Sequence, residues 1–398
     1  MKRLSLFTVC LLLISFCISS VATSNSQAQT TNDISVGAQQ IARYLPLLVN
    51  KHVALVANQS SLVGNIHLLD LLLDSKVNVV SVMSPEHGFR GEAGAGVRVS
   101  DNTDTKTGTP IHSLYGNTKK PTTEMLQGID TIVFDLQDVG VRFYTYLSTL
   151  HYVLEAASEH NIHVVVLDRP NPNGRFVDGP VLQNEFSSFV GIHPIPVLHG
   201  MTLGELALMI KGEGWIENAD ALSLSIIPVA NYHKAMPYDL PVAPSPNLPN
   251  SLSIQLYPTL CFFEGTSVSI GRGTDLPFQL MGHHQVSLGD TKIKVNPNRG
   301  APNPKLNGQT LEASVFSTTS FDGLNIELLI ETHAAFEQAG VNFFDRPRFF
   351  DLLAGSSALR EAIQNNQSAD EIRQLWQQDL AEFMTLRAPY LLYPATKN

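Results

Sequence analysis

The sequence predicts an α/β fold: a Rossmann-like, doubly wound parallel sheet followed by a smaller C-terminal α+β auxiliary domain. Four apolar runs of strand length each end in a short polar cluster. Segments with helical periodicity separate these runs, and such alternation is typical of a parallel sheet covered by helices. Beyond them, residues 235–260 contain six prolines and little periodicity. We therefore predict the Rossmann-like domain over residues 29–240 and the auxiliary domain over residues 241–398.

The elements of the first domain follow from its apolar patterns. Residues 65–75 and 144–161 place apolar side chains on one helical face, and Thr202 with Glu205 forms a capping box that predicts a helix start. The loop at 91–110 is long enough to be a binding loop or a lid. The expected strands comprise residues 53–57, 77–83, 131–134, 163–167 and 222–229.

The second domain has fewer clear signals. Proline fixes φ and removes a backbone donor, so residues 235–260 are expected to form an ordered, extended crossing segment. Two helical patterns follow, at residues 324–339 and 369–387. The remainder is expected to be mixed.

The N-terminus predicts export. Met1–Arg3 is basic, residues 4–21 are apolar, and Ser26–Ala28 fits a cleavage site, so residues 1–28 are expected to be a signal peptide that is removed. A membrane anchor is the alternative, because the apolar stretch nears spanning length, and a lipid on Cys17 is another. The mature protein is then periplasmic or secreted. Cys261 would be its only cysteine, which excludes an internal disulfide.

Charge and motif content exclude several classes of partner and cofactor. The formal charge of the whole chain is −10, and it becomes −12 once Lys2 and Arg3 are removed. The chain has no basic run, so neither nucleic acid nor an anionic membrane surface is an expected partner. It also lacks the spacing of a zinc site, a nucleotide fingerprint or a serine-hydrolase elbow. We therefore expect no metal and no organic cofactor; the oligomeric state is left open.

Polar clusters at the ends of four predicted strands indicate an enzyme. The carboxyl ends of parallel strands share one edge of the sheet, and ligands bind beyond that edge. A dense polar site around a few carboxylates would result. The side chains expected there are Asn58 after the first strand, Glu86 and His87 after the second, Gln137 and Asp138 after the third, and Asp168, Arg169 and Asn171 after the fourth.

Glu86 is the strongest catalytic candidate among them. Pro85 and Gly88 constrain its turn, so the carboxyl group is held on a stiff element, where it can act as a general acid. The alternative is a loop carboxylate paired with Arg90 or His87. His87 and Asp138 are further catalytic candidates.

Other motifs predict contacts with a ligand, each with a structural alternative. Arg142, Tyr144 and Tyr146 combine donors and rings in the way a sugar site needs, or they form a helix entry that Asp138 caps. Arg169 binds a carboxylate or belongs to an internal Asp–Arg network. The remaining candidates are His199, which precedes a helix or is structural, and Glu264 with Arg272, whose guanidinium binds ligand or points to solvent.

Taken together, these motifs resemble the NamZ-type exo-β-N-acetylmuramidases, in family order from about residue 50 to residue 394. The segments that carry the resemblance are Pro85–Gly88, Gln137–Gly140 with Arg142–Tyr146, Asp168–Pro172, His199–Thr202, Pro244–Pro249, Glu264–Thr266, Gly271–Thr274, and Arg387 with Tyr390–Tyr393. Residues 281–325 and Gly174–Phe176 depart from the family pattern.

The resemblance implies a Rossmann-like domain with a smaller C-terminal domain completing a cleft. It also implies an activity, the removal of terminal β-1,4-linked N-acetylmuramic acid from the non-reducing ends of peptidoglycan fragments. The expected partners are therefore peptidoglycan-derived saccharides that contain N-acetylmuramic acid and N-acetylglucosamine. Glu86 matches the family's catalytic glutamate.

A substrate-assisted mechanism suits this substrate, because the sugar carries a 2-acetamido group. Glu86 would protonate the leaving oxygen, and Asp138 or Asp168 would orient the acetamido N–H. Arg169 or Arg272 would bind the lactyl carboxylate, and Tyr144 and Tyr146 would contact the ring. Two alternatives are a saccharide-binding protein without catalysis and a deacetylase on the same scaffold.

Overall fold

The N-terminal half is built on a seven-stranded sheet with the order β11–β8–β7–β1–β4–β6–β5, and all neighbouring strands are parallel except β5 and β6. This order is that of a doubly wound Rossmann sheet, with β1 and β7 on either side of the point where the winding reverses. The predicted fold class is confirmed. The strands are β1 (His52–Ala57), β4 (Asn78–Ser84), β5 (Asn102–Thr103), β6 (Pro110–Ser113), β7 (Thr131–Asp135), β8 (His163–Leu167) and β11 (Leu224–Ile227).

The computed structural model describes residues 33–90, 101–318 and 322–396. The predicted signal peptide at residues 1–28 and the first half of the loop at 91–110 lie outside these residues. The described residues from Ile34 onward belong to one compact unit. The predicted domain boundary near residue 240 stays a prediction.

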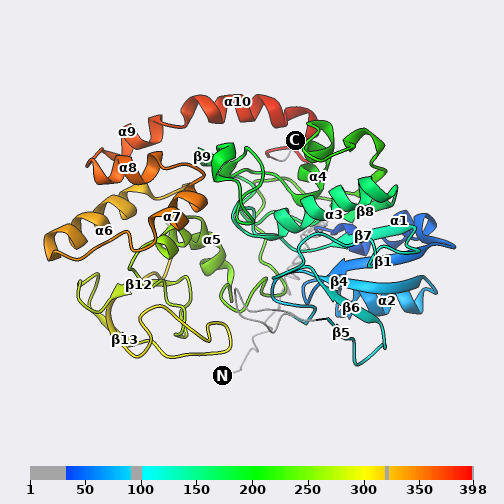
Figure 1. Ribbon diagram of the computed structural model, residues 1–398, viewed down its shortest axis with the longest axis horizontal. Coiled ribbons are helices and arrows are strands. Elements are labelled where there is room, and N and C mark those ends of the chain that lie inside the picture. The colour runs from blue at the N-terminus through cyan, green and yellow to red at the C-terminus, as the bar shows by residue number, and fades with distance from the viewer. Residues whose placement is uncertain (1–32, 91–100, 319–321, 397–398) are drawn as a thin grey trace, which may run out of the picture. The chain divides into compact units, whose positions relative to one another are not determined.

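Helices cover both faces of the sheet. The side chains of each strand alternate between the two faces, so each strand contributes to the packing on both sides. Val53 and Leu55 of β1 pack with α1 (Ile41–Leu48) and α2 (Leu68–Asp74). Ala54 and Val56 pack instead with α3 (Tyr146–His160) and α4 (Leu203–Gly212), which lie on the opposite side of the sheet (Figure 1). Burial of both faces explains why the strands are nearly continuous apolar runs.

Local side-chain caps set the starts of several helices, among them α4. Thr202 accepts a hydrogen bond from the N–H of Glu205 at 3.2 Å, and the Glu205 carboxylate accepts one from the N–H of Thr202 at 3.0 Å, so the predicted capping box is confirmed. The helix predicted from residue 65 begins only at Leu68. A short hairpin of β2 (Leu62–Val63) and β3 (Ile66–His67) precedes it.

The crossing segment at 235–260 is extended only in its first part, because α5 (Ser251–Leu260) begins after Asn250. Asn250 caps this helix by accepting a hydrogen bond from the N–H of Ser253 at 2.9 Å. Pro258 lies inside α5 and cannot donate to the carbonyl of Ile254. That carbonyl instead accepts from Nδ2 of Asn173 at 3.3 Å.

The C-terminal domain combines a three-stranded antiparallel sheet, in the order β12–β14–β13, with a group of helices. The helix predicted at 369–387 is in fact two helices. The break lies at Leu375 and Trp376, where the Trp376 ring is buried and its indole N–H donates to Asp178 Oδ1 at 3.3 Å. The elements are η4 (Cys261–Gly265), β12 (Leu280–His283), β13 (Thr291–Lys294), β14 (Thr310–Val315), α6 (Ile326–Ala339), α7 (Pro347–Ala354), α8 (Ala358–Gln364), α9 (Ala369–Gln374) and α10 (Gln377–Arg387).

Short elements complete the described chain, and α10 carries it back over the N-terminal half, past α4 (Figure 1). None of the helices within residues 33–90, 101–318 and 322–396 is long and apolar enough to cross a membrane. The short elements are β9 (Asp178–Val181), β10 (Pro196–Leu198), η1 (Gly37–Gln39), η2 (Asn184–Phe186), η3 (Ala219–Ala221) and η5 (Ala388–Tyr390).

Candidate active site

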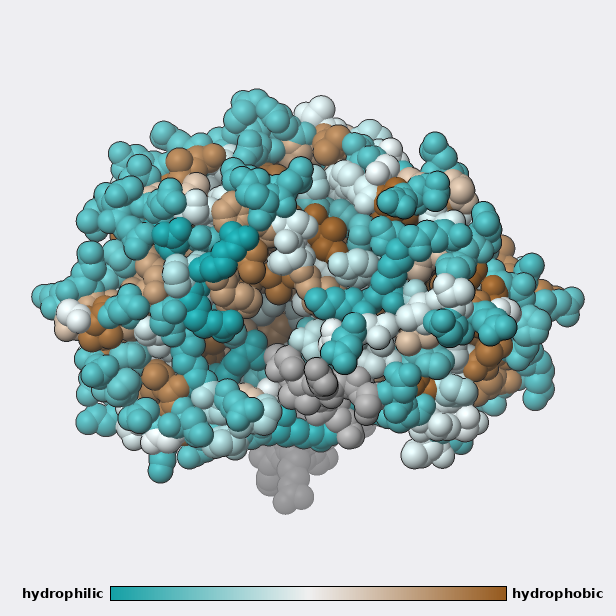
Figure 2. Space-filling view, in the orientation of Figure 1, coloured by the Kyte–Doolittle hydropathy of each residue, from teal (hydrophilic) through white to brown (hydrophobic). Residues whose placement is uncertain are grey.

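A cavity of about 700 Å³ is lined by residues from the sheet edge and from the C-terminal domain. Figure 2 shows this face of the molecule, which is hollowed near its centre, with hydrophobic residues beside hydrophilic ones. Of the fourteen predicted site residues, five line the cavity: Glu86, His87, Tyr144, Glu264 and Arg272. The charged and polar lining also includes Thr145, Lys305 and Arg346, and the apolar lining includes Tyr115, Phe143, Phe189, Tyr257, Phe278 and Phe349.

Glu86 lies two residues after β4, at the carboxyl edge of the sheet, and is 8% exposed. Its Oε2 accepts a hydrogen bond from Oγ1 of Thr145 at 2.7 Å. His87 has a positive φ of 74°, and the Gly88 N–H donates to the Pro85 carbonyl at 3.1 Å, so the turn is tight. Of the two alternative partners, Arg90 forms an ion pair with Asp104, and pairing with His87 stays a prediction. Glu86 is therefore a carboxyl group held on a constrained turn in the cavity wall.

Two tyrosines beside Glu86 join the sheet edge to the proline-rich segment. The Tyr144 hydroxyl donates to the carbonyl of Pro244 at 3.0 Å, and the Tyr146 hydroxyl lies 3.3 Å from the same oxygen. The Tyr146 hydroxyl also accepts from Nδ2 of Asn58 at 2.7 Å. Their rings pack edge to face, with centroids 4.8 Å apart. Tyr146 and Asn58 thus support the turn of Glu86 from behind, while Tyr144 lines the cavity.

The same contacts explain why several predicted residues lie outside the cavity. In a doubly wound sheet the crevice beyond the point where the winding reverses is open to ligand. Here residues 243–244 of the chain itself lie there, because Gln59 Nε2 donates to the carbonyls of Ala243 and Pro244, at 3.1 Å each. The polar residues next to β1 and β7 bind this covering segment and each other.

Arg169 forms a buried ion pair instead of lining the cavity. Its Nε and Nη2 donate to the two carboxylate oxygens of Asp135 at 2.6 and 2.9 Å, and Nη2 also donates to the Leu62 carbonyl at 3.2 Å. The two side chains are 3% and 0% exposed. Of the two alternatives for Arg169, a carboxylate ligand or an internal Asp–Arg network, the structure shows the internal network. Arg169 is not placed to bind a lactyl carboxylate.

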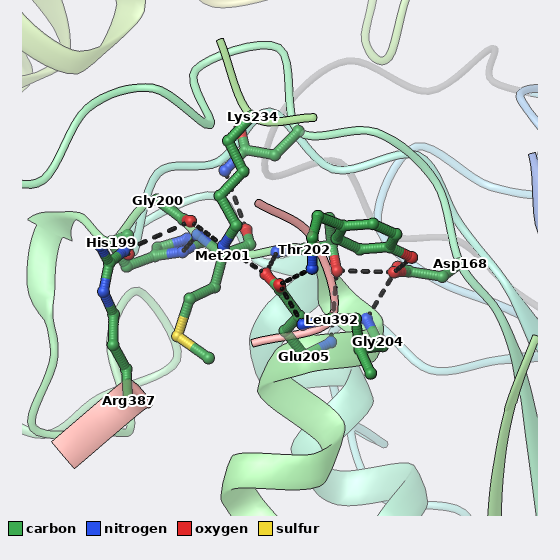
Figure 3. Close-up of polar contacts among 12 residues, drawn as sticks. Asp168, His199, Gly200, Met201, Thr202, Gly204, Glu205, Lys234, Arg387 and Leu392 are labelled. Carbon is green, nitrogen blue, oxygen red and sulfur yellow. Dashed lines mark hydrogen bonds and ion pairs between the residues drawn. The ribbon is translucent and has the colours of Figure 1, made fainter. Parts of the chain in front are cut away.

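Asp168 is likewise bound internally (Figure 3). Its carboxylate accepts from Oγ1 of Thr202 and Oη of Tyr393, each at 2.6 Å, and from the N–H of Gly204 at 2.8 Å. Burial raises the pKa of Asp168 to about 6, although these donors act in the opposite direction. Asp168 thus joins β8 to α4 and to the C-terminal tail, which we define as residues 390–395. It lies away from the cavity lining.

A second part of this network surrounds Glu205 (Figure 3). Its Oε2 accepts from Nζ of Lys234 at 2.7 Å, and its Oε1 accepts from the N–H of Leu392 at 2.8 Å. Lys234 and Arg387 both donate to the Gly200 carbonyl, at 2.6 and 3.4 Å. The buried ions at the start of α4 therefore fix the C-terminal tail to the N-terminal half.

His199 also belongs to this buried region. Its Nδ1 accepts from the N–H of Met201 at 3.2 Å. Burial lowers the pKa of His199 to about 3, and Lys234, Arg387 and Arg142 contribute to the same shift, so the ring is neutral. His199 is therefore a buried structural histidine, which was the alternative to a ligand contact.

The remaining predicted residues bond to backbone groups. Arg142 donates to the carbonyls of Pro180, Ile195 and Leu353 at 2.6–2.8 Å, and burial lowers its pKa to about 9. Burial also raises the pKa of Asp138 to about 7, and its Oδ2 accepts from the N–H of Gly140 at 2.7 Å. The last two are Gln137, which donates to the Pro170 carbonyl at 2.8 Å, and Asn171, which donates to the Met201 carbonyl at 2.8 Å.

The C-terminal domain contributes a charged wall to the cavity. Nε of Arg272 donates to Oε1 of Glu264 at 2.5 Å, and its guanidinium lies 4.9 Å from the centroid of Phe278. Lys305 donates to the carbonyl of Thr266, just beyond η4, and lies 3.8 Å from an oxygen of Asp345. Arg272 therefore faces Glu264 and a ring, which contradicts the alternative of a turn arginine pointing to solvent.

Sequence reasoning missed much of this wall. Lys305 and Arg346 lie in segments without a recognisable motif, and their positions depend on how α7 packs on η4. Thr145 lies within the Arg142–Tyr146 segment that carries the family resemblance, and its position one residue before α3 is the signal that could have identified it. Within the described ranges, no group of three His, Cys, Asp or Glu side chains is arranged to hold a metal ion.

Comparisons with known proteins agree with the residue motifs. Family models described as exo-beta-N-acetylmuramidase NamZ, N-terminal and C-terminal, match residues 53–252 and 255–393. A peptidoglycan beta-N-acetylmuramidase NamZ from Bacillus subtilis (strain 168) is 37% identical over 377 residues, which cover 88% of this chain and 89% of that protein.

Solved structures show the same architecture. The crystal structure of a DUF1343 family protein from Bacteroides fragilis NCTC 9343 has a TM-score of 0.83 and 42% identity, and covers 92% of this chain and 100% of its own. A second such protein from that organism has a TM-score of 0.78 and 29% identity, with coverages of 90% and 99%. The resemblance inferred from the motifs is confirmed: the chain belongs to the family of NamZ exo-β-N-acetylmuramidases and is a glycoside hydrolase.

Proposed function

We propose that this hydrolase removes terminal β-1,4-linked N-acetylmuramic acid from the non-reducing ends of peptidoglycan fragments, with Glu86 as the general acid and base. The B. subtilis relative is named for peptidoglycan β-N-acetylmuramidase activity, which supports this substrate class. The observation that carries the proposal is the position of Glu86. It is a constrained, nearly buried carboxyl group in the wall of a cavity large enough for a sugar ring.

The proposed reaction proceeds through the substrate's own acetamido group. Glu86 donates a proton to the glycosidic oxygen while the acetamido oxygen attacks the anomeric carbon, and the bond between that carbon and the leaving oxygen breaks. Glu86, now a carboxylate, then takes a proton from a water molecule that opens the cyclic intermediate. Two inversions at the anomeric carbon leave its configuration unchanged.

The second carboxylate in the wall supports this substrate-assisted route. A mechanism with two enzyme carboxyl groups needs a nucleophile or a base in addition to the acid. Among the described lining residues, Glu264 is the other carboxylate, and its Oε1 is bound to Arg272 at 2.5 Å. This charge-assisted bond occupies one carboxylate oxygen and neutralises part of its charge, which reduces its nucleophilicity. Neither aspartate expected to orient the acetamido N–H is among the described lining residues: Asp168 is bound to Thr202, and Asp138 accepts from the N–H of Gly140 at 2.7 Å.

Product analysis on the disaccharide of N-acetylmuramic acid and N-acetylglucosamine tests the proposal. We expect free N-acetylmuramic acid from the non-reducing end, and NMR during turnover should detect its β-anomer first. Initial release of the α-anomer would exclude the acetamido route. Cleavage within longer glycan strands, without release of terminal sugar, would exclude the exo-acting function.

Thr145 should act as a positioning residue for Glu86. Replacing Thr145 by valine removes the donor at 2.7 Å and preserves the side-chain shape. We expect kcat to fall about tenfold with KM within about twofold, because a hydrogen bond to a charged group is worth roughly 1.5–3 kcal/mol. The matched control is Thr145→Ser, which keeps the hydroxyl and should restore most of the activity. Equal activity of the valine and serine variants would contradict this role.

We also propose that the protein is exported, through the leader predicted at residues 1–28. Its proposed substrate lies outside the cytoplasmic membrane, which agrees with the basic start, apolar stretch and cleavage pattern of that segment. Cell fractionation with a C-terminal epitope tag measures the location, and mass spectrometry of the mature N-terminus measures the cleavage.

A further inference from the structure

We propose that Arg346 binds a carboxylate carried by the 3-O-lactyl substituent of the substrate sugar, and so determines the preference for N-acetylmuramic acid over N-acetylglucosamine. This inference rests on the proposed function and assigns a part of the same cavity that sequence reasoning gave to Arg169 or Arg272. It depends on the charges of the cavity wall and on which of them other side chains already neutralise.

The described part of the cavity lining has an excess of positive charge. Its ions are the carboxylates Glu86 and Glu264 and the cations Arg272, Lys305 and Arg346. This local charge of +1 contrasts with a formal charge of −10 for the whole chain. A positive cavity in an acidic protein favours an anionic ligand, because the field is focused where the ligand binds. The lactyl group is what gives N-acetylmuramic acid its negative charge.

Two of the three cations are already bound within the protein. Arg272 is paired with Glu264 at 2.5 Å. Lys305 donates to the backbone carbonyl of Thr266 and lies near Asp345, with its Nζ 3.8 Å from the carboxylate. Both side chains therefore have a structural partner that a substrate carboxylate would have to displace.

Arg346 has no such partner within residues 33–90, 101–318 and 322–396. Its guanidinium makes no hydrogen bond or ion pair to a side chain there, and it lies 4.4 Å from the centroid of the Phe349 ring. Stacking on an aromatic ring fixes the plane of a guanidinium and leaves its edge available for bidentate binding of a carboxylate. Both Arg346 and Phe349 line the cavity.

The backbone of Arg346 is rigidly placed. Its N–H donates to the Gly265 carbonyl at 3.1 Å, and its own carbonyl accepts from the N–H of Phe350 at 3.0 Å. Gly265 allows this close approach, because a Cβ there would lie 2.6 Å from the Cα of Phe350. The start of α7 is thus held directly against η4, which also carries Glu264. Arg346 is therefore presented from a fixed position, as a specificity-determining side chain requires.

The chain contains a matched control two residues away. Arg348 also lies over a phenylalanine ring, 4.7 Å from the centroid of Phe186, and it is exposed like Arg346. Its Nη2 donates to the Glu185 carbonyl at 3.2 Å, and it is not among the cavity-lining residues. A general effect of removing a surface arginine from α7 should appear equally in both variants.

The test compares Arg346→Gln with Arg348→Gln on three glycosides with the same chromogenic leaving group. The first is a β-N-acetylmuramide with a free lactyl carboxylate, and the second is its lactyl methyl ester. The third is the muramyl dipeptide, in which the lactyl group is an amide and the carboxylate belongs to the peptide. We expect Arg346→Gln to lower kcat/KM on the free acid about 10- to 100-fold and to leave the ester within about twofold.

The arms of the test separate the possible outcomes. A lower kcat/KM of Arg346→Gln on the free acid identifies the lactyl carboxylate as the ligand of Arg346. A lower kcat/KM on the dipeptide alone identifies a carboxylate of the peptide stem instead. Arg346→Lys should keep part of the preference, and added salt should raise KM for the free acid in the wild type and in Arg348→Gln but not in Arg346→Gln. Equal kinetics of Arg346→Gln and wild type on all three glycosides would overturn the inference while leaving the proposed function intact.

Failure of the proposed function would look different, because the wild type would then cleave none of the three glycosides. Calorimetric titration with free N-acetylmuramic acid would still decide the inference in that case. Weaker binding to Arg346→Gln than to the wild type and Arg348→Gln would support it, and the same affinity for all three proteins would refute it.

Discussion

Replacement of Glu86 by glutamine is expected to lower kcat on the natural disaccharide by a factor of ~10²–10⁴, the range that a positioned general acid contributes. Glutamine preserves the size of the side chain, and its amide oxygen can still accept from Oγ1 of Thr145, at 2.7 Å from the carboxylate in the wild type. Binding of free N-acetylmuramic acid to the variant should therefore stay within a few-fold of the wild-type value. What the variant loses is the proton for the leaving oxygen.

The dependence on the leaving group makes this test specific. A dinitrophenolate leaves without protonation, so Glu86→Gln should be far less impaired on a dinitrophenyl β-N-acetylmuramide than on the disaccharide. The control is Glu264→Gln, which changes the other described carboxylate of the cavity wall and its pairing with Arg272. That variant should lose activity to a similar degree on both substrates. The same loss on both substrates for Glu86→Gln would remove its assignment as the acid.

A second large effect is expected on stability, from replacing Arg169 by alanine. This change leaves Asp135, which is 0% exposed, without its cation. Breaking a buried ion pair by removing one partner costs about 3–5 kcal/mol. Urea unfolding followed by circular dichroism should show this decrease in the free energy of unfolding, with an unchanged m-value.

Two control variants make the result interpretable. Arg373→Ala breaks an ion pair of similar geometry with Glu327, but its side chains are 32% and 50% exposed, so about 0–1 kcal/mol should be lost. The double variant Asp135→Leu with Arg169→Met replaces both charges by apolar groups of similar size and should recover most of the stability. A loss of less than about 1 kcal/mol for Arg169→Ala would show that the Asp135 carboxylate is not desolvated as described.

The strands and the sheet edge could be predicted because they depend on local pattern. Four strands, β1, β4, β7 and β8, are apolar on both faces and end at polar residues. The start of α4 is determined by the capping box of Thr202 and Glu205. The position of Glu86 follows from the same reasoning, because a residue just after a parallel strand must lie at the carboxyl edge.

The role of each polar residue at that edge could not be predicted in the same way. Whether Arg169 and Asn58 contact a ligand depends on which distant segment covers them, and the covering residues near Pro244 lie far along the chain. Arg346 was missed for a related reason. Its place in the cavity wall comes from the packing of α7 on η4 through Gly265, and no local pattern encodes such a contact.

The hydrogen bonds of Leu392 and Tyr393 have a consequence for how the Rossmann half is assembled. Both residues bind ions at the start of α4, and Lys234 and Ala235 pair their N–H groups with the carbonyls of Pro394 and Ala395 at 3.0 and 2.9 Å. The Rossmann half is therefore completed by a segment that follows the whole C-terminal domain in the sequence.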